Sequence, residues 1–248
     1  MDVTIDNARE LVADASLWPL VRDFLWDFAP QIHPTWIEGL NGEGQGSNAD
    51  DSNQEQSTTE ELPENETPKR QTFPALVQNL QDSPRVKRFI LDSLGVEPCF
   101  HAFPKDDWSR LLLLDGATLA SIAKWLGALA CADALRKVTD GAVVRGLKAG
   151  LPGVYPEVFG FAAYFKSKVE SLKVESLNPD LVVSAGWKIL SSSLSLLPEC
   201  LLRRLVLKLP KGFGQPDPRL STFDFRLSTA NLQLLLKLRF PEAYNLCC

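Results

Sequence analysis

The chain has 248 residues, enough for one domain of ordinary to large size, or two small ones, without disulfide staples. Its 45% hydrophobic and 23% charged residues exclude a disordered or fibrous chain. Five cysteines scattered through the sequence exclude a disulfide framework and favour a reducing, cytosolic setting. Because the N-terminus is acidic and no uncharged apolar run reaches roughly 18 residues, we expect neither a secretory signal nor insertion into a membrane.

The charge is unevenly distributed. Residues 41 to 68 contain eight acidic side chains and no Lys or Arg, so the other residues carry +3 against -5 for the whole chain. The stretch is also rich in Gly, Ser, Asn and Thr, and it cannot bury enough apolar surface to offset the entropy of ordering it. We therefore predict an N-terminal helical segment over 1–40 that docks on the body, an acidic disordered linker over 41–70, and a helical body over 71–248.

Helix signals dominate the body. Ser83-Pro84 supplies an N-cap and a proline in the first turn, and Leu94-Gly95 supplies a stop, which predicts a helix over 84–94. Apolar residues at spacings of three and four with very few charges predict a helix over 118–138 that is buried on most sides. Similar patterns predict helices over 179–190, 198–209 and 228–236, with a Pro- and Gly-rich loop over 210–222. Alternation with a period of two is nearly absent, so we expect an all-α, irregular helical bundle.

The sequence offers no recognisable catalytic, metal or cofactor constellation. Only two histidines occur, His33 and His101, and no G-x-S-x-G elbow accompanies them, so we assign both a surface or packing role. No two internal cysteines have the short spacing of about two to four residues that zinc sites use. Asp106 and Asp107 precede Trp108 at the start of an apolar helix, where carboxylates favour the helix dipole. We therefore predict no enzyme, no metal and no cofactor.

A basic region follows residue 200. Residues 200 to 240 carry a net charge of +6 and match no nucleic-acid recognition motif, so we expect no nucleic-acid partner. Our hypothesis is a basic face for an acidic partner surface, with charge-steered assembly. Because Arg204 and Lys208 lie at i and i+4, their charge reversal should weaken binding and leave the melting temperature unchanged. A solvated helix face is the competing interpretation. The residues of the predicted basic face are Arg203, Arg204, Lys208, Lys211 and Arg226.

Three stretches of the sequence follow the pattern of one known family. The most specific contains Leu126-Gly127, an apolar run, Asp133-Ala134, an aliphatic residue and the basic pair Arg136-Lys137. Residues 15–22 contain an early Ser-Leu-Trp helix, and residues 203–210 form a late basic, leucine-rich segment ending in Leu-Pro. In these stretches the chain resembles the YscK/SctK family of bacterial type III secretion systems. The acidic stretch 41–70 departs from the family pattern.

The resemblance implies a non-enzymatic role in protein transport and virulence. Family members are adaptors of the sorting platform in the bacterial cytoplasm, peripheral to the inner-membrane secretion apparatus. They link the cytoplasmic domain of the SctD-type ring protein to the SctQ-type pod protein. The SctL stalk then leads from the pod to the export ATPase. The implied partners are thus the SctD-type and SctQ-type proteins directly, and SctL and the ATPase indirectly.

Two alternatives from other classes remain open. A secreted effector or host-facing interaction protein could have this composition, and it would itself leave the cell. A helical small-molecule carrier is the other alternative, and it would contain an internal apolar cavity whose ligand raises the melting temperature. The pair Arg136-Lys137 also has a simpler interpretation, as cations placed favourably at the end of a helix dipole.

Overall fold

Helices form every regular element in the part of the chain that the structure describes. The computed structural model describes residues 14–39, 83–105, 107–162, 177–215, 220 and 229–247. No strand occurs in these ranges, so the predicted all-α class is confirmed. The predicted acidic linker over 41–70 lies outside the described residues.

The described elements fall into three groups along the chain. The N-terminal segment contains η1 (Ala15–Leu17), α2 (Trp18–Leu25), η2 (Ala29–Gln31) and α3 (Pro34–Gly39). The next elements are α5 (Pro84–Ser93), η3 (Trp108–Leu113), α6 (Gly116–Ala130), α7 (Ala132–Arg136), α8 (Gly141–Gly150) and α9 (Val158–Ala162). The chain ends with α10 (Pro179–Ser193), α11 (Glu199–Leu207), α12 (Thr229–Arg239) and α13 (Pro241–Cys247).

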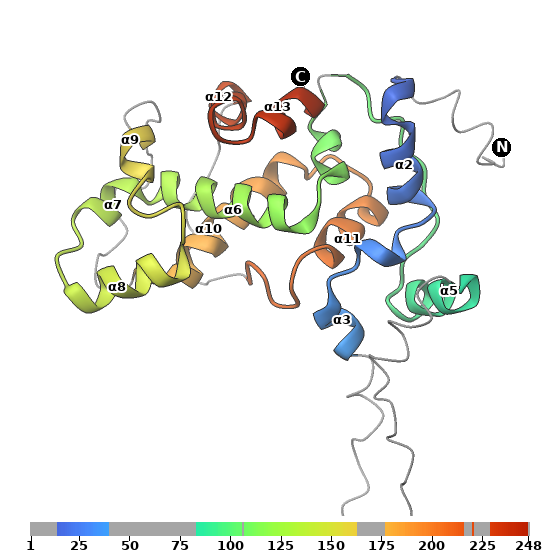
Figure 1. The fold of residues 1–248 in the computed structure, drawn as a ribbon, viewed down its shortest axis with the longest axis horizontal. Coiled ribbons are helices and arrows are strands. Elements are labelled where there is room, and N and C mark those ends of the chain that lie inside the picture. The colour runs from blue at the N-terminus through green and yellow to red at the C-terminus, as the bar shows by residue number, and fades with distance from the viewer. Residues whose placement is uncertain are drawn as a thin grey trace, which may run out of the picture.

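Helix α6 lies near the centre, along the long axis of the molecule (Figure 1). The helices α7, α8 and α9 gather at one end, and α2, α3 and α5 lie at the other. Eight of the residues of α6 are buried, which agrees with the predicted helix that is buried on most sides: Leu119, Ile122, Ala123, Trp125, Leu126, Gly127, Ala128 and Leu129.

Most predicted helices occur with small differences at their ends. The carboxylate of Asp115 caps α6 by accepting from the Thr118 N–H at 2.9 Å, so the helix begins before residue 118. The predicted segment 118–138 is two helices, because Cys131 leaves helical geometry at φ -93° and ψ 5°. Asn178 caps α10 as expected, through Leu181 N–H at 2.7 Å. Asp107 caps η3, a 3-10 helix where an α-helix was expected.

The closest helix contact in the core joins α6 to α10. A Cβ atom on Gly127 would lie 1.8 Å from the Val182 carbonyl oxygen, and one on Gly186 would lie 1.7 Å from the Ala123 carbonyl oxygen. The backbone of each helix therefore occupies the space that a side chain on the other helix would need. Close approach of this kind gives the flanking apolar side chains dense packing along both helices.

The N-terminal segment contacts α11 and the residues after it. The His33 N–H donates to the Leu207 carbonyl at 2.8 Å, and the Trp36 indole donates to the Leu209 carbonyl at 2.8 Å. Two phenylalanines of this segment, Phe24 and Phe28, are fully buried and pack edge to face, with 5.6 Å between their ring centroids. The Phe24 and Phe28 rings are thus removed from water, whereas Trp18, Trp26 and Trp36 of the same segment are only partly buried.

Replacing Gly127 with alanine should destabilise the protein, because the new methyl group would collide with the α10 backbone. We expect a loss of about 3 kcal/mol in the free energy of unfolding, measured by urea denaturation. Gly146→Ala is the matched control, because a Cβ at this helical position in α8 meets no atom within 4 Å. Alanine should stabilise there by up to about 1 kcal/mol. Equal effects at the two positions would contradict the close crossing.

Candidate functional site

The structure separates the predicted basic face into buried and exposed cations. Arg203 and Lys211 are exposed, whereas Arg204 and Lys208 are 2% and 3% exposed. Arg226 lies outside the described residues. The prediction that Arg204 and Lys208 share one helix face is correct in register, but that face turns into the body. These two side chains therefore do not belong to an exposed surface, and this part of the basic-face hypothesis is wrong.

Arg204 joins the N-terminal segment to the stretch after α5. Its guanidinium donates from Nη1 to the Phe24 carbonyl at 2.7 Å and from Nη2 to the Glu97 carbonyl at 3.0 Å. The guanidinium carbon also lies 5.3 Å from the centroid of the Phe28 ring. Carbonyl dipoles and aromatic faces thus replace the water that this charge has lost.

The Lys208 side chain hydrogen-bonds to the turn between η3 and α6. Its ammonium donates to the carbonyls of Leu112 and Leu114 at 2.6 and 2.8 Å, and it lies 4.7 Å from the centroid of the Phe24 ring. Burial lowers the pKa of this ammonium to about 7, and the Asp115 carboxylate acts in the opposite direction. The charge of Lys208 is therefore a component of the folded core, and its protonation state is coupled to folding.

Replacing Arg204 with alanine should lower stability rather than leave the melting temperature unchanged. The variant leaves the carbonyls of Phe24 and Glu97 without their donor and empties the space beside Phe28. We expect a loss of about 3 kcal/mol, measured by urea unfolding. Arg203→Ala is the control on the same helix, because the exposed Arg203 bonds only the Leu94 carbonyl and should cost about 1 kcal/mol. Equal losses in both variants would refute the structural role of Arg204.

The free energy of unfolding should increase with pH, because the pKa of Lys208 is lower in the folded chain than in the unfolded chain. The folded state releases the Lys208 proton near pH 7, and the unfolded state holds it until about 10.5. Between these values the unfolded chain binds more protons, so the free energy of unfolding rises with pH, by up to about 1.4 kcal/mol per unit. We expect a steeper rise between about pH 7 and pH 9 in the wild type than in Lys208→Met, measured by urea titration. Parallel profiles would contradict the coupling.

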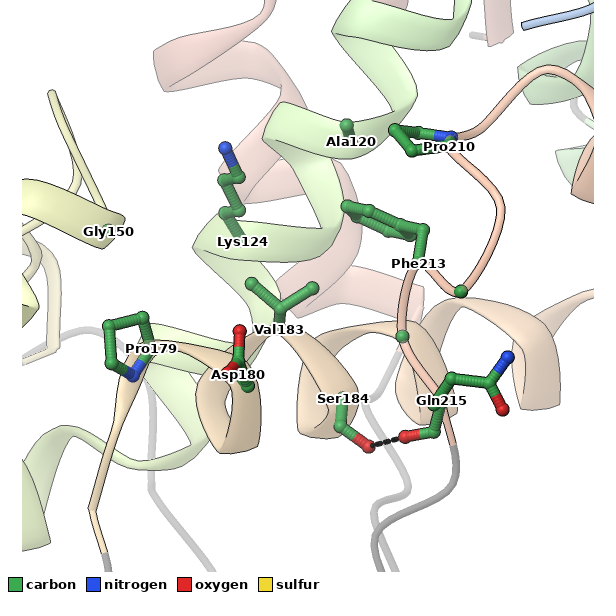
Figure 2. Close-up of a pocket in the computed structure, with 12 residues that line it drawn as sticks. Ala120, Lys124, Gly150, Pro179, Asp180, Val183, Ser184, Pro210, Phe213 and Gln215 are labelled. Atoms are coloured by element: carbon green, nitrogen blue, oxygen red, sulfur yellow. Dashed lines mark hydrogen bonds between the residues drawn. The ribbon is translucent and has the colours of Figure 1, made fainter. Parts of the chain in front are cut away.

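A groove of about 640 Å³ opens between α6, α10 and the loop after α11. Figure 2 shows the Phe213 ring facing α6, with Lys124 on one side and Val183 below it. Asp180 lies on α10 along the same groove. The Ser184 hydroxyl donates to the Gln215 carbonyl at 2.7 Å and so holds the loop to α10.

A smaller hollow of about 140 Å³ adjoins the groove on the other side of the Phe213 loop. Trp36 and Trp187 line it, and the Lys211 ammonium lies 5.9 Å from the centroid of the Trp36 ring. Gly214 adopts φ +62°, and a Cβ there would lie 2.4 Å from the Trp187 Cβ, so the position accepts only glycine. The two hollows together have apolar and aromatic walls with a few charged side chains.

The two histidines contact neighbouring side chains. The His101 ring packs edge-on to Phe103, with 5.0 Å between centroids, and burial lowers the pKa of His101 while Asp107, at 3.9 Å, acts to raise it. His33 Nδ1 lies 3.0 Å from the Thr35 hydroxyl. Within the described ranges, no cluster of three His, Cys, Asp or Glu side chains could hold a metal ion. None of the helices described is long and apolar enough to cross a membrane.

The residues of the most specific family-like stretch have structural contacts. Leu126 and Ala134 are buried, and Gly127 is at the crossing with α10. Asp133 and Arg136 form an ion pair at 3.2 Å, and Lys137 is exposed. Arg136 also lies 5.9 Å from the Phe159 ring centroid of α9.

Comparisons of the chain with protein-family models, curated proteins and solved structures find no match.

Sequence reasoning missed several features of the candidate site. The groove residues Lys124 and Phe213 are far apart in sequence, and nothing in their sequence neighbourhoods indicates that they line one groove. The two glycines at 212 and 214 did predict a loop, but its contact with Trp187 depends on tertiary structure. Sequence analysis also missed helix α8, in which Leu147 is the one fully buried residue and Val143 and Val144 are half-buried.

Proposed function

We propose that the chain is a non-enzymatic adaptor of the YscK/SctK kind, linking an SctD-type ring protein to an SctQ-type pod protein in the bacterial cytoplasm. One observation carries the proposal. The helices that contain the three family-like stretches are neighbours in the fold, although they are far apart in the sequence. Arg204 of α11 bonds the Phe24 carbonyl of α2, and the start of α6 at Gly116 packs against the Lys208 carbonyl. These contacts join α2 and the start of α6 to α11, whereas residues 126–137 lie at the other end of α6 and in α7 and pack against α10 and α9.

Partner contacts of such an adaptor require exposed residues. Helix α8 presents Arg145 and Lys148 to solvent, and Lys137 is exposed shortly before it. None of the three forms an ion pair with a described residue, whereas Asp140 is engaged as the cap of α8. By contrast, Arg88 and Lys87 of α5 are paired with Asp92 and Asp27. The α8 surface, defined by Lys137, Arg145 and Lys148, is thus a better candidate than α5 for binding an acidic surface of a partner.

A crosslinked pull-down from the native cell tests the proposal. The tagged full chain should recover an inner-membrane ring protein and a pod protein at low salt, identified by mass spectrometry. The double variant Arg145→Glu with Lys148→Glu should reduce recovery of one of them about tenfold, because like charges would face the acidic partner surface. Its melting temperature should stay close to that of the wild type, because both side chains are exposed.

The matched control is Arg85→Glu with Arg88→Glu on α5, which changes the net charge by the same amount. We expect this variant to keep both partners. Equal loss of partner recovery in the two variants would reject the α8 surface as the binding site. General charge attraction would then be the cause of the binding. Recovery of neither ring nor pod protein with the intact wild-type chain would overturn the adaptor proposal itself.

A further inference from the structure

A separate groove, of about 630 Å³, opens between α2, η2, η3, the start of α6 and α13. Helices α2 and α13 both contact η3 and lie near the same end of the molecule (Figure 1). We name this hollow the α2–α13 groove. Its apolar lining residues are Leu20, Pro30, Leu113, Leu114 and Leu246.

The apolar surface of the groove extends from the core to solvent. Leu113 is 7% exposed and belongs to the core, whereas Leu20 on α2 is 43% exposed and Pro30 is exposed as well. An exposed apolar side chain at the edge of a hollow leaves surface in contact with water that a docked apolar group would cover. The groove therefore has the lining of a docking site.

Two buried cations hold the walls of the groove in place. The Lys208 ammonium donates to the Leu114 carbonyl at 2.8 Å, and the Arg110 guanidinium donates to the Leu246 carbonyl at 3.1 Å. Each of these two cations is 3% exposed, so its hydrogen bonds are made inside the protein and its charge is little available to a ligand. Walls fixed in this way need little reordering when a partner binds.

The charge that faces solvent around the groove is negative. The carboxylates of Asp115 and Glu242 line the groove on two different walls, at the start of α6 and in the first turn of α13. Both residues are exposed, and neither forms an ion pair with a described residue. The α2–α13 groove thus combines an apolar floor with an acidic rim.

We propose that the α2–α13 groove binds an amphipathic helix of a partner protein, whose apolar face enters the groove and whose Lys or Arg side chains pair with Asp115 and Glu242. A helix that docks in a groove presents apolar side chains one turn apart, flanked by polar ones. The described part of the chain contains no strand, so an extended peptide would find no sheet edge there to extend. The acidic rim attracts a basic helix and repels an acidic one, which gives the groove its specificity.

The groove and the basic α8 surface differ in charge and in position. The groove lies at the α2 end of the molecule, and α8 lies at the opposite end (Figure 1). A basic partner at the groove would therefore leave the α8 surface free for an acidic one. The groove binds its helix whether or not the chain is an adaptor of the secretion kind, and a synthetic probe tests it without any secretion protein.

Fluorescence anisotropy of a labelled synthetic helix with the full-length protein tests the proposal. The probe is an amphipathic peptide of leucine and lysine, about 14 residues or four helical turns long. A second peptide has the same apolar face and glutamate in place of every lysine. We expect the lysine peptide to bind at least about tenfold more tightly than the glutamate peptide, and its affinity to fall with added salt.

Two substitutions locate the binding site, each with a matched control. Leu20→Ser should weaken binding of the lysine peptide about fivefold through lost apolar contact, whereas Leu196→Ser should leave it unchanged, because Leu196 is 98% exposed and lies outside the groove. Glu242→Lys should weaken the lysine peptide about tenfold and strengthen the glutamate peptide. Glu199→Lys is its control, because Glu199 is an exposed glutamate in the first turn of α11.

Equal affinity of the wild type for the two peptides would overturn the proposal, because the acidic rim would then select nothing. Equal losses in the substitutions and their controls would also overturn it, because the peptide would bind elsewhere. If the lysine peptide binds only to a chain that lacks residues 1–13, the groove belongs to those residues and not to a partner. If sedimentation shows a dimer that Leu20→Ser abolishes, the occupant is a second copy of the chain.

Discussion

The crossing of α6 and α10 is the constraint on which the other contacts depend. Gly127 and Gly186 bring the two backbones so close that neither tolerates a Cβ. Further close contacts extend from this pair of helices: Gly116 at the start of α6 meets the Lys208 carbonyl, and Gly214 meets Trp187 of α10. The position of α11 and of the Phe213 loop is therefore set by the α6–α10 spacing. A wider crossing would alter the groove, whose walls are these same elements.

Two buried cations, Arg204 and Lys208, fix neighbouring segments to the body. Arg204 attaches the short N-terminal segment. Apolar burial alone is non-directional, whereas a guanidinium that bonds two named carbonyls fixes both position and orientation. Arg204 does this for Phe24 and Glu97, and Lys208 does it for the turn that starts α6. Desolvating the charges costs stability, and the carbonyls and Phe rings offset part of that cost.

Much of the helical architecture could be predicted because its signals are local. Caps such as Asn178, the proline of Pro84 and the apolar spacing of α6 depend on neighbouring residues only. The surroundings of a charged side chain, by contrast, depend on residues that are distant in the sequence. Arg204 and Lys208 were expected in solvent because Arg and Lys are rarely buried, and their aromatic and carbonyl partners come from segments about 100 to 180 residues away. The groove could not be predicted for the same reason, since Lys124 and Phe213 come to line it only in the folded chain.

The burial of these cations changes where the protein can meet an acidic partner. Charge buried at Arg204 and Lys208 is unavailable at the surface, whereas α8 carries the exposed cations Arg145 and Lys148, which form no ion pair with a described residue. Because one guanidinium bonds both the Glu97 and the Phe24 carbonyls, a shift of the stretch 94–97 would move a donor that also holds α2. Arg204 therefore couples the stretch after α5 to the attachment of the N-terminal segment, through a single side chain that contacts both.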